Sequence, residues 1–175
     1  MVFPTETVYG IAADPSSPAA VRRLRALKGR SQTKAMTLQV ATVAQALKLV
    51  RPDPRFARCA RKFWPGPLTI VAAAPRGARK VGVRIPAHPT ALGILRAFGK
   101  PLIVTSANRS GQPELWRRNE LKKFFDGKAG AVFWEPSRPR LASTVIDVSG
   151  KDAVRVLREG RISEKEIQRA VSAAA

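Results

Sequence analysis

Two short segments combine cationic and hydroxyl side chains at spacings that suit an anionic ligand. The first, KGRSQTK, places Lys28, Arg30 and Lys34 within seven residues, at the exit of a predicted helix. Lysine ammonium groups and a planar arginine fork can converge on one phosphate chain. Cations at a helix C-terminus are also favoured by the helix dipole alone. The spacing therefore leaves both a phosphate clamp and a simple helix end open.

The second segment, TSANRSG, contains Ser106 and Asn108 and follows the apolar run PLIVT. Open α/β sheets usually hold their ligands at the end of such a buried strand, where both side chains could donate hydrogen bonds to phosphate or ribose oxygens. A serine followed two residues later by asparagine is also a common turn. From these residues alone the turn is the favoured interpretation.

Two further segments place polar side chains beside apolar runs. FPTETVYG, residues 3–10, carries Thr5 and Thr7 together with a carboxylate and a phenol, which predicts a polar turn. VGVRIPAHP places Arg84 at the end of a predicted strand, and an arginine there can pair with a carboxylate in a bidentate manner. These residues alone do not identify the ligand.

Several familiar sites are excluded because their patterns are missing. The sequence has no GxxxxGK[ST] loop, no GxGxxG after a strand, no GxSxG and no HExxH. Its single cysteine, Cys59, rules out a disulfide framework and a cysteine metal cluster, and is expected to fill the core. Any metal is therefore expected to be Mg²⁺ that arrives with a nucleotide and is held mainly by phosphate oxygens.

The charge of the chain favours a polyanionic partner. Its 32 Lys and Arg against 12 Asp and Glu leave a formal charge of +20, which suits nucleic acid or nucleotide phosphates. A solvated basic surface is the alternative. With 175 residues, a single domain over 1–175 is expected. Without an apolar run of about 20 residues or a signal peptide, a cytoplasmic protein is expected.

Strands and helices alternate along the chain, which predicts an α/β fold with a twisted mixed sheet and helices packed around it. Predicted strands cover residues 1–3, 36–40, 68–74, 82–85, 101–105, 131–135, 143–148 and 153–157. Predicted helices cover residues 18–28, 43–50, 54–63, 90–98 and 116–125, and a last helix opens with Ser163 and Glu166 as a capping box.

The segments PTETVYG, KGR, FWPGPLT, VGVRIPAHP, TSANRSG, STVIDV and VLREG follow one another in an order that resembles the YrdC family, over residues 3–162. Core members of that family are threonylcarbamoyl-AMP synthases. The resemblance implies a YrdC-like domain with a concave, positively charged cavity, in which L-threonine, bicarbonate and ATP give threonylcarbamoyl-AMP and pyrophosphate. The product would pass to the downstream threonylcarbamoyl transfer machinery that makes the t6A modification of tRNA.

The resemblance also implies roles for individual residues. It assigns threonine binding to Thr5, Thr7, Gln39, Arg84, Val104 and Ser143. It assigns ATP binding to Lys28, Arg30, Lys34, Ser106, Asn108 and Arg158, with Lys28 and Arg30 as the catalytic cations. Gln39 and Lys34 stand where relatives commonly have histidine and asparagine. Compared with relatives, the first strand is expected to be shortened, and the C-terminal domain of longer members is expected to be missing.

An RNA-binding module that keeps this cavity but does not synthesise the adenylate is the alternative function. The segment WRRNELKKFF, residues 116–125, places arginines and lysines beside aromatic rings, as a surface that follows a phosphate backbone would. Bare RNA binding would not require Lys28, Arg30, Ser106, Asn108 and Arg158 together, so synthesis is the preferred prediction.

Overall fold

The computed structural model describes residues 1–29, 36–51, 53–76, 79–136, 141–150 and 153–172. Its strands are β1 (Val2–Phe3), β2 (Gly10–Ala13), β3 (Thr37–Gln39), β4 (Leu68–Ala73), β5 (Lys80–Arg84), β6 (Leu102–Ser106), β7 (Thr144–Asp147) and β8 (Arg155–Arg158). Its helices are α1 (Pro18–Lys28), α2 (Val43–Leu47), α3 (Pro54–Phe63), α4 (Pro89–Phe98), α5 (Arg118–Phe125) and α6 (Glu164–Ser172).

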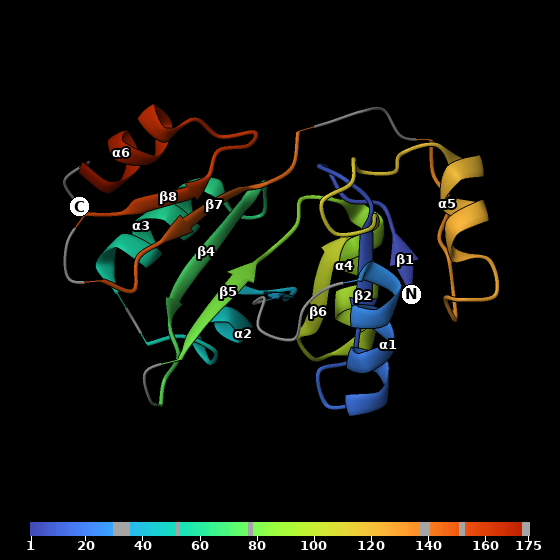
Figure 1. The fold of residues 1–175 in the computed structure, drawn as a ribbon. Helices are drawn as coiled ribbons and strands as arrows, with labels where there is room; N and C mark the ends of the chain where they lie inside the picture. The colour runs from blue at the N-terminus through green and yellow to red at the C-terminus, as the bar shows by residue number, and fades with distance from the viewer. Residues whose placement is uncertain (30–35, 52, 77–78, 137–140, 151–152, 173–175) are drawn as a thin grey trace.

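The strands form an eight-stranded mixed sheet in the order β1-β2-β6-β3-β5-β4-β7-β8 (Figure 1). The β3–β5 and β4–β7 pairs are parallel, and the other neighbouring pairs are antiparallel. The predicted α/β fold with a mixed sheet is thus confirmed. Register matters for the site, because Gln39 of β3 lies opposite Arg84 of β5.

Local sequence accounts for the ends of the helices. Ser17 precedes α1 and its hydroxyl accepts from the Ala20 amide at 3.2 Å, while Gly29 closes the helix with a φ of 57°. That left-handed conformation favours glycine. The predicted capping box is confirmed at α6, where the Ser163 amide donates to Glu166 Oε2 at 2.9 Å and the Glu166 amide donates to Ser163 Oγ at 3.4 Å. None of the helices in the described ranges is long and apolar enough to cross a bilayer.

Buried apolar side chains divide between the two ends of the sheet. Helices α3 and α6 pack together beside β4, β7 and β8, whereas α1 and α5 lie at the opposite end (Figure 1). Cys59 of α3 is fully buried in the apolar cluster between α3, α6 and the sheet, which confirms its expected place in the core. Separate apolar clusters therefore stabilise the two ends of the sheet, on either side of the central strands.

Two segments differ from the prediction. Residues 10–13 follow the predicted polar turn of residues 3–10 and were not predicted as a strand, but they form β2, because they pair with β6 in an antiparallel ladder. Residues 131–135, predicted as a strand, make only an isolated bridge between Val132 and Val2. β1 has just two residues, so the hydrogen bonds from the Val2 amide to Ala131 and from the Phe133 amide to Val2 cannot extend into a ladder.

Candidate functional site

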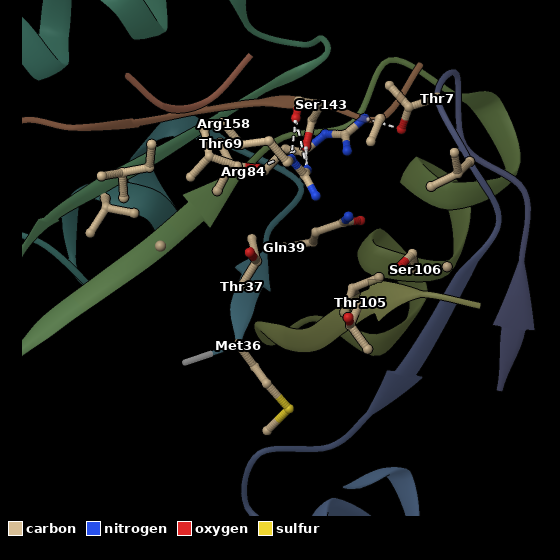
Figure 2. A pocket seen from close by; sticks show the side chains of 18 of the residues that line it. Thr7, Met36, Thr37, Gln39, Thr69, Arg84, Thr105, Ser106, Ser143 and Arg158 are labelled. Atoms are coloured by element: carbon tan, nitrogen blue, oxygen red, sulfur yellow. Dashed lines mark hydrogen bonds between the residues drawn. The ribbon is translucent and has the colours of Figure 1, made fainter. Parts of the chain in front are cut away.

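A cavity of about 520 Å³ opens over the central strands, and its walls come from β3 to β8 and from the turn before β2 (Figure 2). The six residues predicted to bind threonine all line it: Thr5, Thr7, Gln39, Arg84, Val104 and Ser143. Residues far apart in the chain are thus brought to one place. Their individual roles remain predictions.

Internal hydrogen bonds hold the turn that carries Thr5 and Thr7. The Thr5 hydroxyl donates to the Val8 carbonyl at 2.6 Å, and the Thr7 amide donates to Thr5 Oγ1 at 3.1 Å. The two hydroxyls lie 2.9 Å apart and both residues are buried. A side chain that forms hydrogen bonds with nearby backbone groups stabilises a turn. Thr5 therefore fixes the turn, and the turn holds the Thr7 hydroxyl at the cavity wall.

Arg84 joins this turn to β5. Its Nε donates to the Gly66 carbonyl at 3.1 Å, and its Nη2 donates to Glu6 Oε1 at 2.7 Å and to Thr7 Oγ1 at 3.0 Å. Burial lowers the pKa of the Arg84 guanidinium, and the charge of Glu6 opposes that shift. Sequence reasoning missed Glu6, although a carboxylate between two threonines was a visible signal for a cation partner.

Arg158 and Ser143 meet on the same side of the cavity as Arg84 (Figure 2). The guanidinium of Arg158 donates from Nε and Nη2 to the Ser143 carbonyl at 3.2 and 2.8 Å, and the Ser143 hydroxyl lies 3.2 Å from that of Thr69. Gly160 permits this close approach, because a Cβ there would lie 2.2 Å from the Ala142 carbonyl oxygen. The predicted ATP ligand Arg158 therefore contacts the predicted threonine ligand Ser143.

Gln39 is 4% exposed and lines the cavity. Its Oε1 is buried and accepts no hydrogen bond within the described part of the chain. In Figure 2 the amide extends into the space between Arg84 and Ser106. A buried amide oxygen without a donor is costly, so this atom suits a ligand that brings an N–H or O–H.

The loop after β6 presents Ser106 to the cavity and keeps Asn108 behind it. Ser106 lines the cavity and donates from Oγ to Asn108 Oδ1 at 2.6 Å. Neither Asn108 nor Lys28 is among the described lining residues, and both are buried. The Lys28 ammonium contacts this loop instead. Arg30 and Lys34 lie outside the described residues.

A group that sequence reasoning missed lies at the rim formed by β5, β7 and β8. Asp147 Oδ2 is 3.0 Å from Lys80 Nζ and 3.4 Å from Arg155 Nη2, and all three residues line the cavity. Burial raises the pKa of Asp147, but hydrogen bonds from Ser149 and the charge of Lys80 outweigh it and lower the pKa to about 2. Arg155 faces Asp147 across the β7–β8 pair, but Lys80 is 67 residues from Asp147 and is brought to it only by the sheet order.

The chain matches the Sua5_yciO_yrdC family model, which is described as telomere recombination, over residues 1–160. It belongs to the Sua5/YciO/YrdC family. A threonylcarbamoyl-AMP synthase of Bacillus subtilis (strain 168) is 35% identical over 96% of this chain and 51% of the relative. The predicted family resemblance is thus confirmed. The chain spans about half the length of this relative.

Solved structures agree with this family assignment. The crystal structure of Pyrococcus abyssi Sua5 complexed with L-threonine has a TM-score of 0.85 and 34% identity, over 98% of this chain and 53% of that one. Escherichia coli YciO, at 21% identity, has a TM-score of 0.87 over 95% of this chain and 85% of that one, which supports the fold. The chain therefore has the fold of this family.

Proposed function

We propose that this chain synthesises threonylcarbamoyl-AMP from L-threonine, bicarbonate and ATP, with release of pyrophosphate, for the t6A modification of tRNA. The observation that carries the proposal is the convergence of Thr7, Arg84 and Ser143 on one cavity. The similarity to Sua5 solved with L-threonine and to curated threonylcarbamoyl-AMP synthases supports it. The reaction transfers an adenylyl group, so the enzyme would be a nucleotidyltransferase of the cytoplasm.

In this proposal Arg84 binds the carboxylate of threonine. Its Nε and Nη2 are engaged by protein atoms, so its remaining edge, Nη1, is the one that a substrate carboxylate would share. A guanidinium held in a fixed orientation loses little conformational freedom when it binds an anion. Gln39 Oε1 would accept from the amine or hydroxyl of the same ligand.

ATP would place its phosphates between Ser106 and Arg158, which both line the cavity. Asn108 would support this site from behind, and Arg30 and Lys34, which lie outside the described residues, are proposed to complete it. The carbamate of threonine would attack the α-phosphate, and cations would stabilise the charge that accumulates on pyrophosphate. Holding the reactants in line can contribute about 7 to 11 kcal/mol to catalysis.

Mg²⁺ is proposed to enter this site bound to ATP. Asp147 is the one carboxylate among the described lining residues, and Lys80, Arg155 and Ser149 already engage it. A hard cation prefers oxygen ligands, so the phosphate oxygens of ATP would supply most of its coordination. The metal would neutralise the charge of the departing pyrophosphate.

A second candidate function is RNA binding without synthesis, through the surface around α5. Three guanidinium groups lie over aromatic rings there: Arg117 at 4.6 Å from the Trp116 ring, Arg118 at 5.8 Å from Trp134 and Arg109 at 5.9 Å from Phe124. Stacked guanidinium groups can track a phosphate backbone and pack on bases. The surface around α5 would contact tRNA whether or not the chain also synthesises the adenylate.

The deciding experiment is pyrophosphate release from ATP, with threonine and bicarbonate each omitted in turn. The proposal predicts release only when both are present, together with Mg²⁺, and formation of a product with the mass of threonylcarbamoyl-AMP. Serine in place of threonine is the matched control. Release that is independent of threonine would refute synthesis, and tRNA retention without any release would favour the RNA-binding alternative.

A further inference from the structure

Lys28, the last residue of α1, buries its charge beneath the loop that follows β6. The residue is 2% exposed. Its ammonium donates to the Ser106 carbonyl at 2.5 Å, to the Asn108 carbonyl at 2.7 Å and to Asn108 Oδ1 at 3.0 Å. A lysine ammonium has three N–H donors, so it can donate one hydrogen bond to each of these oxygens.

The backbone of Lys28 and the side chain of Asn108 hold the same loop. The Ser110 amide donates to the Lys28 carbonyl at 2.8 Å. Asn108 Nδ2 donates to the Gln112 carbonyl at 2.5 Å, and Asn108 Oδ1 accepts from Ser106 Oγ at 2.6 Å. Residues 106–112 are therefore tied to the end of α1 on one side, while Ser106 lies at the cavity wall on the other.

This arrangement separates Lys28 from an anion in the cavity. To reach a phosphate oxygen, the ammonium would have to leave the three oxygens that it contacts on Ser106 and Asn108. Buried acceptors that lose their donor are destabilising, and the loop that presents Ser106 would lose its attachment to α1. The contacts thus favour an ammonium that stays beneath the loop.

We propose that Lys28 is a positioning residue, which sets the conformation of residues 106–112 for an anionic ligand and does not itself contact the phosphates. The inference deepens the proposed function, because it rests on ATP binding at Ser106. Charge alone is not sufficient for this role. An arginine fork is planar and longer, so it cannot converge on the same three oxygens.

The first test compares Lys28→Met and Lys28→Arg with the exposed control Arg22→Met on the same helix. Amide hydrogen exchange of residues 106–112 is measured without ligand, and ATP affinity is measured by calorimetry. We expect both Lys28 variants to speed exchange and weaken ATP binding by about tenfold or more, the equivalent of one charge-assisted hydrogen bond. The control should match the wild type. Lys28→Arg with wild-type exchange and affinity would overturn the inference.

A double-mutant cycle between Lys28→Met and Asn108→Ala tests whether the two residues act through one loop. Positioning predicts that the double variant loses about as much ATP affinity as the more affected single variant, because the loop is already released. Direct phosphate contact by Lys28 predicts losses that multiply. Multiplied losses would therefore exclude the positioning role.

A third test uses acetylation of the wild-type protein, so its result does not depend on whether a variant folds. A buried ammonium held by three oxygens should react slowly with acetic anhydride both with and without ATP, relative to the exposed Lys165 of α6. A Lys28 that reacts readily and becomes protected by ATP would contact the phosphates and contradict the inference. Hydrogen exchange and the acetylation rate without ATP need no ligand, so they test the Lys28 contacts even if the chain does not synthesise threonylcarbamoyl-AMP and the proposed function fails.

Discussion

Glu6 Oε1 and Arg84 Nη2 lie 2.7 Å apart in an ion pair within the cavity wall. The side chains are only 12% and 6% exposed, and the two residues are 78 positions apart in the chain. The pair therefore fastens the polar turn before β2 to the end of β5.

Replacing Glu6 with glutamine should lower the free energy of unfolding by about 2 kcal/mol, because a buried hydrogen bond to a charged group loses one of its charges. Urea unfolding measures this change. The exposed Glu159→Gln is the matched control and should change stability by less than about 0.5 kcal/mol. Equal stabilities for the two variants would show that the ion pair between Glu6 and Arg84 does not stabilise the folded protein.

Arg84→Lys should raise the KM for threonine by about tenfold or more and leave ATP affinity nearly unchanged, because a lysine ammonium cannot reproduce the fixed fork. Threonine-dependent pyrophosphate release gives the KM, and calorimetry gives the ATP affinity. An unchanged KM for threonine would remove Arg84 from the proposed carboxylate site.

Gly160→Ala should destabilise the protein by about 1 to 3 kcal/mol through overpacking. The new Cβ would lie 2.2 Å from the Ala142 carbonyl oxygen and 2.7 Å from the Ser143 carbonyl carbon, so the backbone must move. Thermal unfolding checks the loss. Gly93→Ala in α4 is the control, because its Cβ meets nothing within 4 Å and alanine favours a helix by about 1 kcal/mol.

Asp147 should make stability depend on acid pH. Its pKa is lowered from 3.8 to about 2 in the folded protein. A lowered folded-state pKa means that the unfolded chain binds the proton more readily, so this contribution is present above pH 3.8 and is lost as the pH falls toward 2. Unfolding free energies of the wild type should fall over that window more steeply than those of Asp147→Asn. Identical slopes would contradict the assignment.

The double variant Arg118→Glu/Lys122→Glu should weaken tRNA binding and lower its salt dependence. Each phosphate contact that is lost reduces the slope of log affinity against log salt by about 0.7 to 0.9. Filter retention across a salt series measures this, beside pyrophosphate release, which should persist. Arg61→Glu/Arg96→Glu, on α3 and α4, provides the same charge change elsewhere. If both double variants bind tRNA with the same affinity, α5 makes no specific contact with RNA.

Most elements with strong local signals were predictable. Residues 54–63 form α3 as predicted because Asp53 caps the helix, Pro54 begins it and an apolar face packs on the core. Residues 10–13 and 131–135 were not predictable, because each depends on a partner strand. β2 exists through its pairing with β6, and residues 131–135 meet only the two-residue β1. Pairing of this kind has no short-range signal.

The sequence alone determined the family and the α/β class, because these depend on motif order and local periodicity. Its assignment of residues to a small amino acid and a nucleotide stays a prediction. Tertiary structure decided how those side chains are used. It paired Glu6 with Arg84, placed Asp147 between Lys80 and Arg155, and turned the Lys28 ammonium toward the loop after β6. Arg155 follows Asp147 by only eight residues, whereas the other contacts join segments that are at least 67 residues apart. Burial and hydrogen-bond geometry, which set the charge and orientation of a side chain, arise only when the sheet brings these segments together.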